Sequence, residues 1–239
     1  MALIQSHPSG RPVFGGLLLA QAMSAASATV PPDFHVYSSQ SSFLRPVTVK
    51  AQETVTYRVD RTNDGRTSAT RIPMPDLDSL QPENVPEDLH RQIMSSSTKG
   101  NTLWHLMSPE GEPFDWRPFG YELTEKPWEA RTRGFCRSPP LSTDAPHVHH
   151  LAALGYMSDE VLLGVPIYAN PDRVGSRTQH ITMAATLSHT MHFHDPTTRI
   201  DQWKVVERET TWGANGRTLV HQRIWDLKSG RLVMPAAGY

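Results

Sequence analysis

The chain has 239 residues, of which 38% are hydrophobic and 20% are charged, so it can form a packed globular core. Its formal net charge of −1 and the lack of a basic stripe in the sequence argue against a nucleic-acid-binding protein. Its longest apolar runs, 15–20 and 161–167, are far shorter than the ~20 residues of a membrane-spanning helix, so we expect no membrane span.

The first element in the chain is a predicted helix that is rich in alanine and leucine. It begins at Gly15 and Gly16 and continues to about Thr29, after which Pro31 and Pro32 stop the pattern. Apolar residues recur in it at helical spacing, and its many small residues would let another backbone approach closely. A helix enclosed by a curved sheet requires such an approach, and we expect that packing here.

Strand patterns follow this helix. Residues 35–44 are rich in serine and aromatic residues, and residues 54–59 alternate between two faces with a period of two. Asn63-Asp64-Gly65 predicts a hairpin turn, because the Asp-Gly pair tolerates positive φ angles. A short strand, 66–71, completes this group.

The composition changes at residue 73, where prolines alternate with acidic side chains. Such a segment is typical of a linker. We therefore divide the chain into an N-terminal domain of residues 1–72, an acidic, proline-rich linker of residues 73–115, and a C-terminal domain of residues 116–239.

The C-terminal domain contains a predicted helix that Asp144 would cap, with Pro146 in its first turn. Residues 181–194 then show the clearest strand pattern in the chain, with an apolar face and a polar face. At ~3.3 Å per residue this strand would span ~46 Å, so it must bend, and bending around a helix is a natural solution. The apolar stripe of the helix consists of Leu151, Leu154, Met157 and Val161.

A second hairpin and a last strand follow. The hairpin consists of residues 205–212, the turn Asn215-Gly216 and residues 217–226. The last strand begins at Arg231, and Pro235 limits the ladder hydrogen bonds that it can make.

The two halves share residues at a nearly constant offset. Phe43 and Pro46 recur as Phe193 and Pro196, 150 positions later, and the turn sequences share Gly-Arg-Thr at an offset of 151. Because the order and spacing of the elements agree as well, we interpret the chain as a duplication. This predicts an α+β protein in which two antiparallel sheets each wrap around a central helix.

The first copy is predicted to be incomplete. Only residues 66–71 follow its turn, whereas two strands follow the turn of the second copy. An incomplete copy leaves a sheet edge or a helix exposed, or covered by a partner chain, so we expect a homo-oligomer.

Several motifs are shared with a known family. Residues 13–22 and 43–46 look like the first hotdog of type II (TesB-type) acyl-CoA thioesterases, and residues 116–118 resemble the element before their second hotdog. Residues 154–159 (Leu-Gly-Tyr-Met-Ser-Asp) match that family's helix motif, and residues 186–194 (Thr-Leu-Ser-His-Thr-Met-His-Phe-His) match its long-strand motif. The resemblance covers nearly the whole chain in order and implies a double-hotdog fold.

The resemblance also implies a reaction. The family has no covalent nucleophile; an Asp, a Ser or Thr, and a Gln on the final strand position a water that attacks the thioester carbonyl. Matched residue by residue, the Asp is Asp159 and the hydroxyl is Thr186. The chain departs from the family at Gly238, where the family has Gln, and at Ser188, where the family's strand motif has Asp. A carboxylate can accept a proton from water, and a nearby hydroxyl can hold that water in line.

We expect substrate contacts at His189, Gly15 and Gly16. The resemblance predicts a thioester hydrolase that acts on acyl-CoA or another acyl thioester, with CoA as part of the substrate and no other cofactor. The altered family residues suggest a specialised acyl or polyketide chain in secondary metabolism. Two alternatives stay open: a hotdog protein that binds or reshapes an acyl ligand without hydrolysis, and a catalytically silent copy that acts through assembly.

A metal site and a reactive cysteine are weaker hypotheses. Cys136 has no neighbouring nucleophile motif, so we expect a buried thiol, and as the only cysteine it excludes an intramolecular disulfide. We expect an intracellular protein, cytoplasmic or peroxisomal, although the C-terminus is not of the Ser-Lys-Leu type.

The residues that suggest a metal are His147, His149, His150, His192, His194 and Asp195, but their spacing matches no strong zinc signature and we predict no metal.

Overall fold

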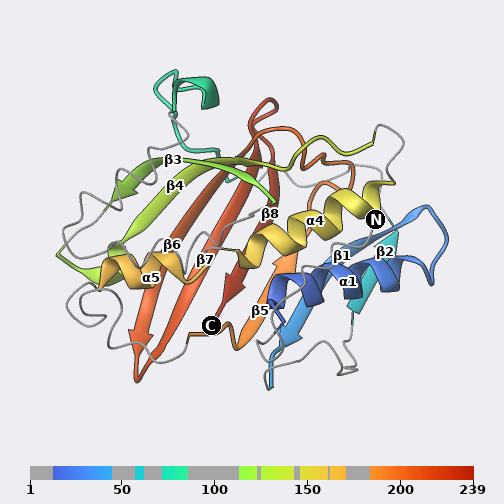
Figure 1. The fold of residues 1–239 in the computed structure, drawn as a ribbon, viewed down its shortest axis with the longest axis horizontal. Coiled ribbons are helices and arrows are strands. Elements are labelled where there is room, and N and C mark those ends of the chain that lie inside the picture. Colours follow the sequence, from blue (N-terminus) through green and yellow to red (C-terminus); the bar gives the residue numbers. More distant parts are fainter. Residues whose placement is uncertain are drawn as a thin grey trace.

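The computed structural model describes residues 13–44, 57–61, 72–85, 113–122, 125–142, 146–160, 162–170 and 184–239. In this part of the chain, eight strands form one antiparallel sheet in the order β2-β1-β5-β8-β7-β6-β4-β3. Helices α1 and α4 lie side by side on one face of this sheet, which we call the inner face (Figure 1). The elements in chain order are α1 (Gly15–Ser27), β1 (Phe34–Ser42), β2 (Tyr57–Arg61), η1 (Pro82–Asn84), β3 (Asp115–Glu122), η2 (Pro127–Glu129), β4 (Arg131–Arg137), α4 (His147–Asp159), α5 (Gly164–Ala169), β5 (Ser188–His192), β6 (Lys204–Ala214), β7 (Arg217–Asp226) and β8 (Leu232–Gly238).

The halves of the chain share this one sheet, so the prediction of two separate sheets is wrong for the described residues. Strand β1 pairs with β5 in antiparallel register, from Ser38 opposite His192 to Ser42 opposite Ser188. Backbone hydrogen bonds of this pair connect the strands of the first half to those of the second. The incompleteness of the first copy stays a prediction, because residues 62–70 lie outside the described part.

The two long helices pack against each other and against the sheet. They run in opposite directions, so that the start of α1 meets the end of α4 (Figure 1). Close approach depends on Gly155, where a Cβ atom would lie 2.7 Å from the sulfur of Met23. Burial of each large apolar side chain contributes roughly 1.5–3 kcal/mol. The shared core includes Leu19, Met23, Leu151, Leu154, Met157, Met191 and Ile224.

Helix α4 begins later than the sequence predicts and ends at Asp159, and Val161, the last residue of the predicted apolar stripe, lies outside the described part. Pro146 is the N-cap and no side chain caps the helix, and residue 144, the predicted cap, lies outside the described part. Eight of its residues are buried, whereas only Gly16, Leu19 and Met23 are buried in α1. Helix α4 is therefore the central helix of the described core, and α1 lies closer to its surface.

Strand β5 is much shorter than predicted. The sequence pattern indicated a strand over 181–194, but regular pairing covers only Ser188–His192, and residues 181–183 lie outside the described part. The neighbouring strands explain the difference, since β1 ends at Ser42, opposite Ser188, and β8 ends at Gly238, opposite His189. Beyond Ser188, Leu187 still bonds through its backbone to Phe43 and Tyr239, and residues 184–186 are not part of a strand.

The second hairpin has the predicted turn. Asn215 and Gly216 have φ angles of 52° and 72°, the left-handed conformation that suits Asn-Gly between two strands. Strand β7 covers Arg217–Asp226, the range predicted for the second arm of this hairpin. Cys136 is fully buried, which confirms the expectation of a buried thiol.

Part of the predicted linker packs on the outer face of the sheet. Met74, Leu77 and Leu80 contact a small core that contains Phe135, Val205 and Trp225. The indole Nε1 of Trp225 also donates a hydrogen bond to the carbonyl oxygen of residue 72 at 3.1 Å. The domain boundaries stay a prediction.

Among the described helices, none is long and apolar enough to cross a membrane.

Candidate functional site

Asp159 and Thr186, the two predicted catalytic residues, are in contact. The hydroxyl of Thr186 donates a hydrogen bond to Asp159 Oδ1 at 2.8 Å. Asp159 is the last residue of α4 and is only 7% exposed, and Thr186 lies just before β5. The structure therefore brings a nearly buried carboxylate and a hydroxyl together. Their catalytic roles stay a prediction.

Gly15 and Gly16, at the start of α1, lie against this pair. A Cβ atom at position 15 would lie 2.7 Å from Asp159 Oδ2, and one at position 16 would lie 2.6 Å from the carbonyl oxygen of Tyr156. Only glycine permits this approach between the helices. The first turn of α1 contains no acidic residue, so the Asp159 carboxylate is a negative charge at the positive end of that helix dipole.

His189 lies beside the same end of α4. Its side chain is fully buried, and its Nε2 lies 3.4 Å from the hydroxyl oxygen of Ser158, the residue before Asp159. Burial lowers the pKa of His189 below its ordinary value, although the charge of Asp159 and a backbone hydrogen bond with Ser158 act in the opposite direction. The imidazole is therefore neutral at neutral pH.

The sequence pattern predicted that the side chains of Thr186 and His189 lie on opposite faces of one strand. Strict alternation over 181–194 assigns Thr186 to the polar face and His189 to the apolar face of one strand. In the structure, regular pairing begins only at Ser188, so the alternation does not extend to Thr186. Both side chains consequently reach the end of α4, one at Asp159 and the other at Ser158.

Gln222 is a functional candidate that the sequence did not reveal. It lies on β7, is 1% exposed, and its Nε2 donates a hydrogen bond to the carbonyl oxygen of Ser158 at 3.3 Å. Its Oε1 accepts a short hydrogen bond from Nε of Arg208 on β6. The sequence contained one sign of this role: Gln222 is a polar residue on the same face of the strand as the apolar residues Val220 and Ile224, and all three are buried.

Glu160 is held on the other side of Asp159. The indole Nε1 of Trp116 donates a hydrogen bond to Glu160 Oε2 at 2.8 Å. The guanidinium of Arg208 lies 4.7 Å from the centre of the Trp116 ring. Both sequence neighbours of Asp159 are thus attached to residues of the sheet, which restricts the position of its backbone.

Gly238 has no space for a longer side chain unless a neighbour moves. It pairs with His189 on β5 and with Val220 on β7. A Cβ atom at this position would lie 2.6 Å from Cδ2 of Leu162. Leu162 therefore occupies the direction in which a glutamine side chain would leave the backbone.

The histidine cluster does not form a metal site in the described part of the chain. No three His, Cys, Asp or Glu side chains in the described ranges come close enough together to hold an ion. His150, one of the residues that suggested a metal, is fully buried on α4. Burial lowers its pKa, and nearby Asp201 acts in the opposite direction.

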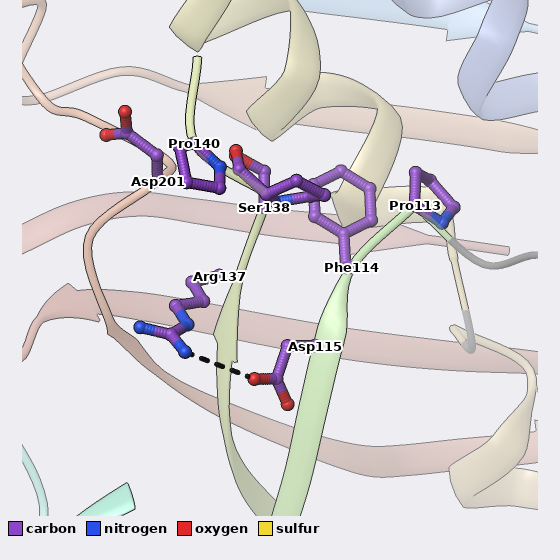
Figure 2. A pocket seen from close by; sticks show the side chains of 8 residues that line it. Pro113, Phe114, Asp115, Arg137, Ser138, Pro140 and Asp201 are labelled. Atoms are coloured by element: carbon purple, nitrogen blue, oxygen red, sulfur yellow. Dashed lines mark hydrogen bonds and ion pairs between the residues drawn. The ribbon is translucent and has the colours of Figure 1, made fainter.

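A cavity of about 360 Å³ lies where β3 begins and β4 ends (Figure 2). Its charged side chains are already paired, with Arg137 Nη2 at 3.5 Å from Asp115 and Arg199 Nη2 at 2.7 Å from Asp201. None of the predicted site residues lines it, so we assign it no part in the reaction. The lining residues are Pro113, Phe114, Asp115, Arg137, Ser138, Pro139, Pro140 and Asp201.

Two family models match the chain. The model described as the acyl-CoA thioesterase C-terminal domain matches residues 78–237, and the model described as the acyl-CoA thioesterase N-terminal domain matches residues 3–72. Together they extend over both halves of the predicted duplication.

The chain is also similar to individual proteins. It is 24% identical to mouse acyl-coenzyme A thioesterase 8, over 91% of this chain and 76% of the relative, and the human protein of that name is 24% identical over 89% and 75%. A solved tesB protein from Mycobacterium avium subspecies paratuberculosis has a TM-score of 0.67 at 19% identity, covering 97% of this chain and 88% of that one. The thioesterase II TesB2 from Mycobacterium marinum has a TM-score of 0.66 at 23% identity, over 94% and 86%. These structures support the hotdog fold.

Proposed function

The chain belongs to the acyl-CoA thioesterase family, and from this premise we propose that it hydrolyses acyl-CoA, or another acyl thioester, to a free acid and a thiol. The observation that carries this proposal is the hydrogen bond between Thr186 and Asp159 at the start of α1. It supplies an anchored carboxylate at a place where two helices and a strand converge.

Asp159 is the proton acceptor in the proposed reaction. Its Oδ1 accepts the hydrogen bond from Thr186, which fixes the plane of the carboxylate and leaves lone pairs of Oδ2 for a water molecule. As the water oxygen attacks the thioester carbonyl carbon, its proton passes to Asp159. The C–S bond then breaks, and the same proton goes to the departing thiolate.

The start of α1 is the proposed site for the carbonyl oxygen. The first N–H groups of a helix have no partner within the helix, so those of Gly15 and Gly16 can donate to the negative oxygen that develops in the transition state. One such donor contributes ~2.7–4 kcal/mol in a well-studied hydrolase. The absence of side chains at both positions lets the substrate approach the backbone.

His189 contacts the acyl side of the thioester in this proposal. As a buried, neutral imidazole it adds no charge that would disfavour an apolar chain. The departures from the family motif, Gly238 and Ser188, lie on paired strands next to it. We propose that these differences adapt the site to a specialised acyl group, such as a polyketide chain of secondary metabolism.

The test is thiol release from acyl-CoAs of several chain lengths. We expect the wild type to release CoA and Asp159→Asn to be slower by at least about 100-fold. A matched control is Asp78→Asn, since Asp78 is exposed and has a φ angle of 46° that asparagine accepts. Equal rates for wild type and Asp159→Asn would contradict the proposal. Ligand binding without CoA release by folded wild type would instead support the non-hydrolytic alternative.

A further inference from the structure

We propose that Gln222 is a positioning residue for the thioester site, held in one orientation by Arg208. The proposal rests on the proposed function, because it concerns how the carboxylate of Asp159 is kept in place. Gln222 lies on β7, and Asp159 ends α4, so the two are far apart in sequence and meet through Ser158.

The orientation of the Gln222 amide follows from its two partners. An arginine guanidinium can only donate hydrogen bonds, so the group that faces Arg208 Nε must be the amide oxygen. The NH₂ group then points to the Ser158 carbonyl, which can only accept. Both contacts are consistent with one amide rotamer, and the reversed rotamer would oppose donor to donor and acceptor to acceptor.

The Ser158 carbonyl is a group that needs an outside donor. The last four carbonyl oxygens of an α-helix have no helical partner, and Ser158 is the next-to-last residue of α4. Ser158 is fully buried, so water does not readily take the place of Gln222. The amide therefore satisfies a buried acceptor directly before the catalytic carboxylate, and movement of this carbonyl would move Asp159.

Gln222 also lies close to the place where the family's amide is missing. It is paired with Ala236 on β8, two residues before Gly238, and alternation assigns positions 236 and 238 to the same face. Leu162 fills the space beside Gly238. We infer that the neighbouring strand β7 provides the amide that holds this site.

Two substitutions separate positioning from packing. Gln222→Met keeps the size of the side chain and removes both polar groups, whereas Gln222→Glu keeps the acceptor for Arg208 and removes the donor to Ser158. We expect each to lower kcat by about 10- to 100-fold, since a displacement of ~1 Å can have that effect, with KM changed less than about threefold. The matched control is Gln40→Met, on the exposed side of β1, which leaves both parameters unchanged.

Full activity of Gln222→Glu would overturn the proposal, because the pairing with Arg208 would then suffice. Equal losses in kcat and in the fraction of folded protein would overturn it as well. Hydrogen exchange in the last turn of α4 provides a readout independent of activity, and we expect exchange at least about tenfold faster in Gln222→Met than in wild type. If the wild type releases no thiol, the proposed function fails; unchanged exchange means that the positioning proposal fails.

Discussion

Gly15, the first residue of α1, lies directly against the carboxylate of Asp159, the last residue of α4. The first half of the chain thus approaches Asp159 through backbone atoms, and the second half contributes the carboxylate that we propose as the proton acceptor. The proposed site therefore lies where the helices of the two halves meet.

Replacement of Gly15 by alanine is expected to impair activity without unfolding the protein. The new Cβ would lie 2.7 Å from Asp159 Oδ2 and 3.1 Å from the Phe43 ring, so the carboxylate must move. Alanine favours a helix over glycine by roughly 0.5–1 kcal/mol, which offsets part of the strain. Thiol release should fall by about 100-fold while the melting temperature changes by a few degrees at most. Gly120→Ala is the control, since its Cβ meets Arg133 at an ordinary 3.4 Å.

Thr186 is expected to act through its hydroxyl. Thr186→Val keeps the shape and removes the donor to Asp159 Oδ1, and should lower kcat by about 10-fold or more. Thr186→Ser keeps the hydroxyl and should retain activity within about threefold. Steady-state kinetics of both variants check this, and similar rates for valine and serine would contradict a role for the hydroxyl.

His189 should make the protein less stable in mild acid. Burial holds its pKa below the ordinary value of 6.5, so the unfolded chain binds a proton that the folded chain does not bind as the pH falls through that value. Stability is therefore constant above about pH 6.5 and falls as the pH drops from there toward the folded pKa. His189→Leu should flatten this part of a melting-temperature profile. A profile equally steep in wild type and variant would contradict the assignment.

The buried pair of Lys204 and Asp226 yields a stability prediction away from the site. Lys204 is fully buried, and its Nζ donates a hydrogen bond to Asp226 Oδ2 at 2.9 Å. Burial lowers the pKa of Lys204, and Asp226 acts against this effect. Asp226→Asn removes the carboxylate that contacts this buried ammonium group and should cost about 3–5 kcal/mol in urea unfolding. Lys204→Met, which removes the buried charge, should cost less.

The sequence was most informative where local patterns decide the structure. The predicted hairpin arm of residues 217–226 forms β7, and Asn215-Gly216 predicted its turn. The family motifs singled out Asp159 and Thr186, which prove to be in contact. These features depend on residues near one another in the chain or on matches to a motif.

Features that depend on distant partners could not be predicted in this way. The extent of β5 is set by where β1 and β8 end, and the single sheet depends on pairing between β1 and β5. Gln222 is a polar residue on an otherwise apolar face, and its proposed role follows only from its hydrogen bond to Ser158 on α4, which is distant in the sequence. Residues 63–67, which carry the first copy of the turn, lie outside the described part.

One isotope measurement tests most directly whether Asp159 activates a water molecule that attacks the thioester. With the enzyme in excess over acyl-CoA in ¹⁸O-water, so that each molecule turns over at most once, we predict one ¹⁸O atom in the released acid and none in the peptide that contains Asp159. Release of unlabelled acid, with ¹⁸O appearing in Asp159, would show that the carboxylate attacks the substrate itself and would contradict the account.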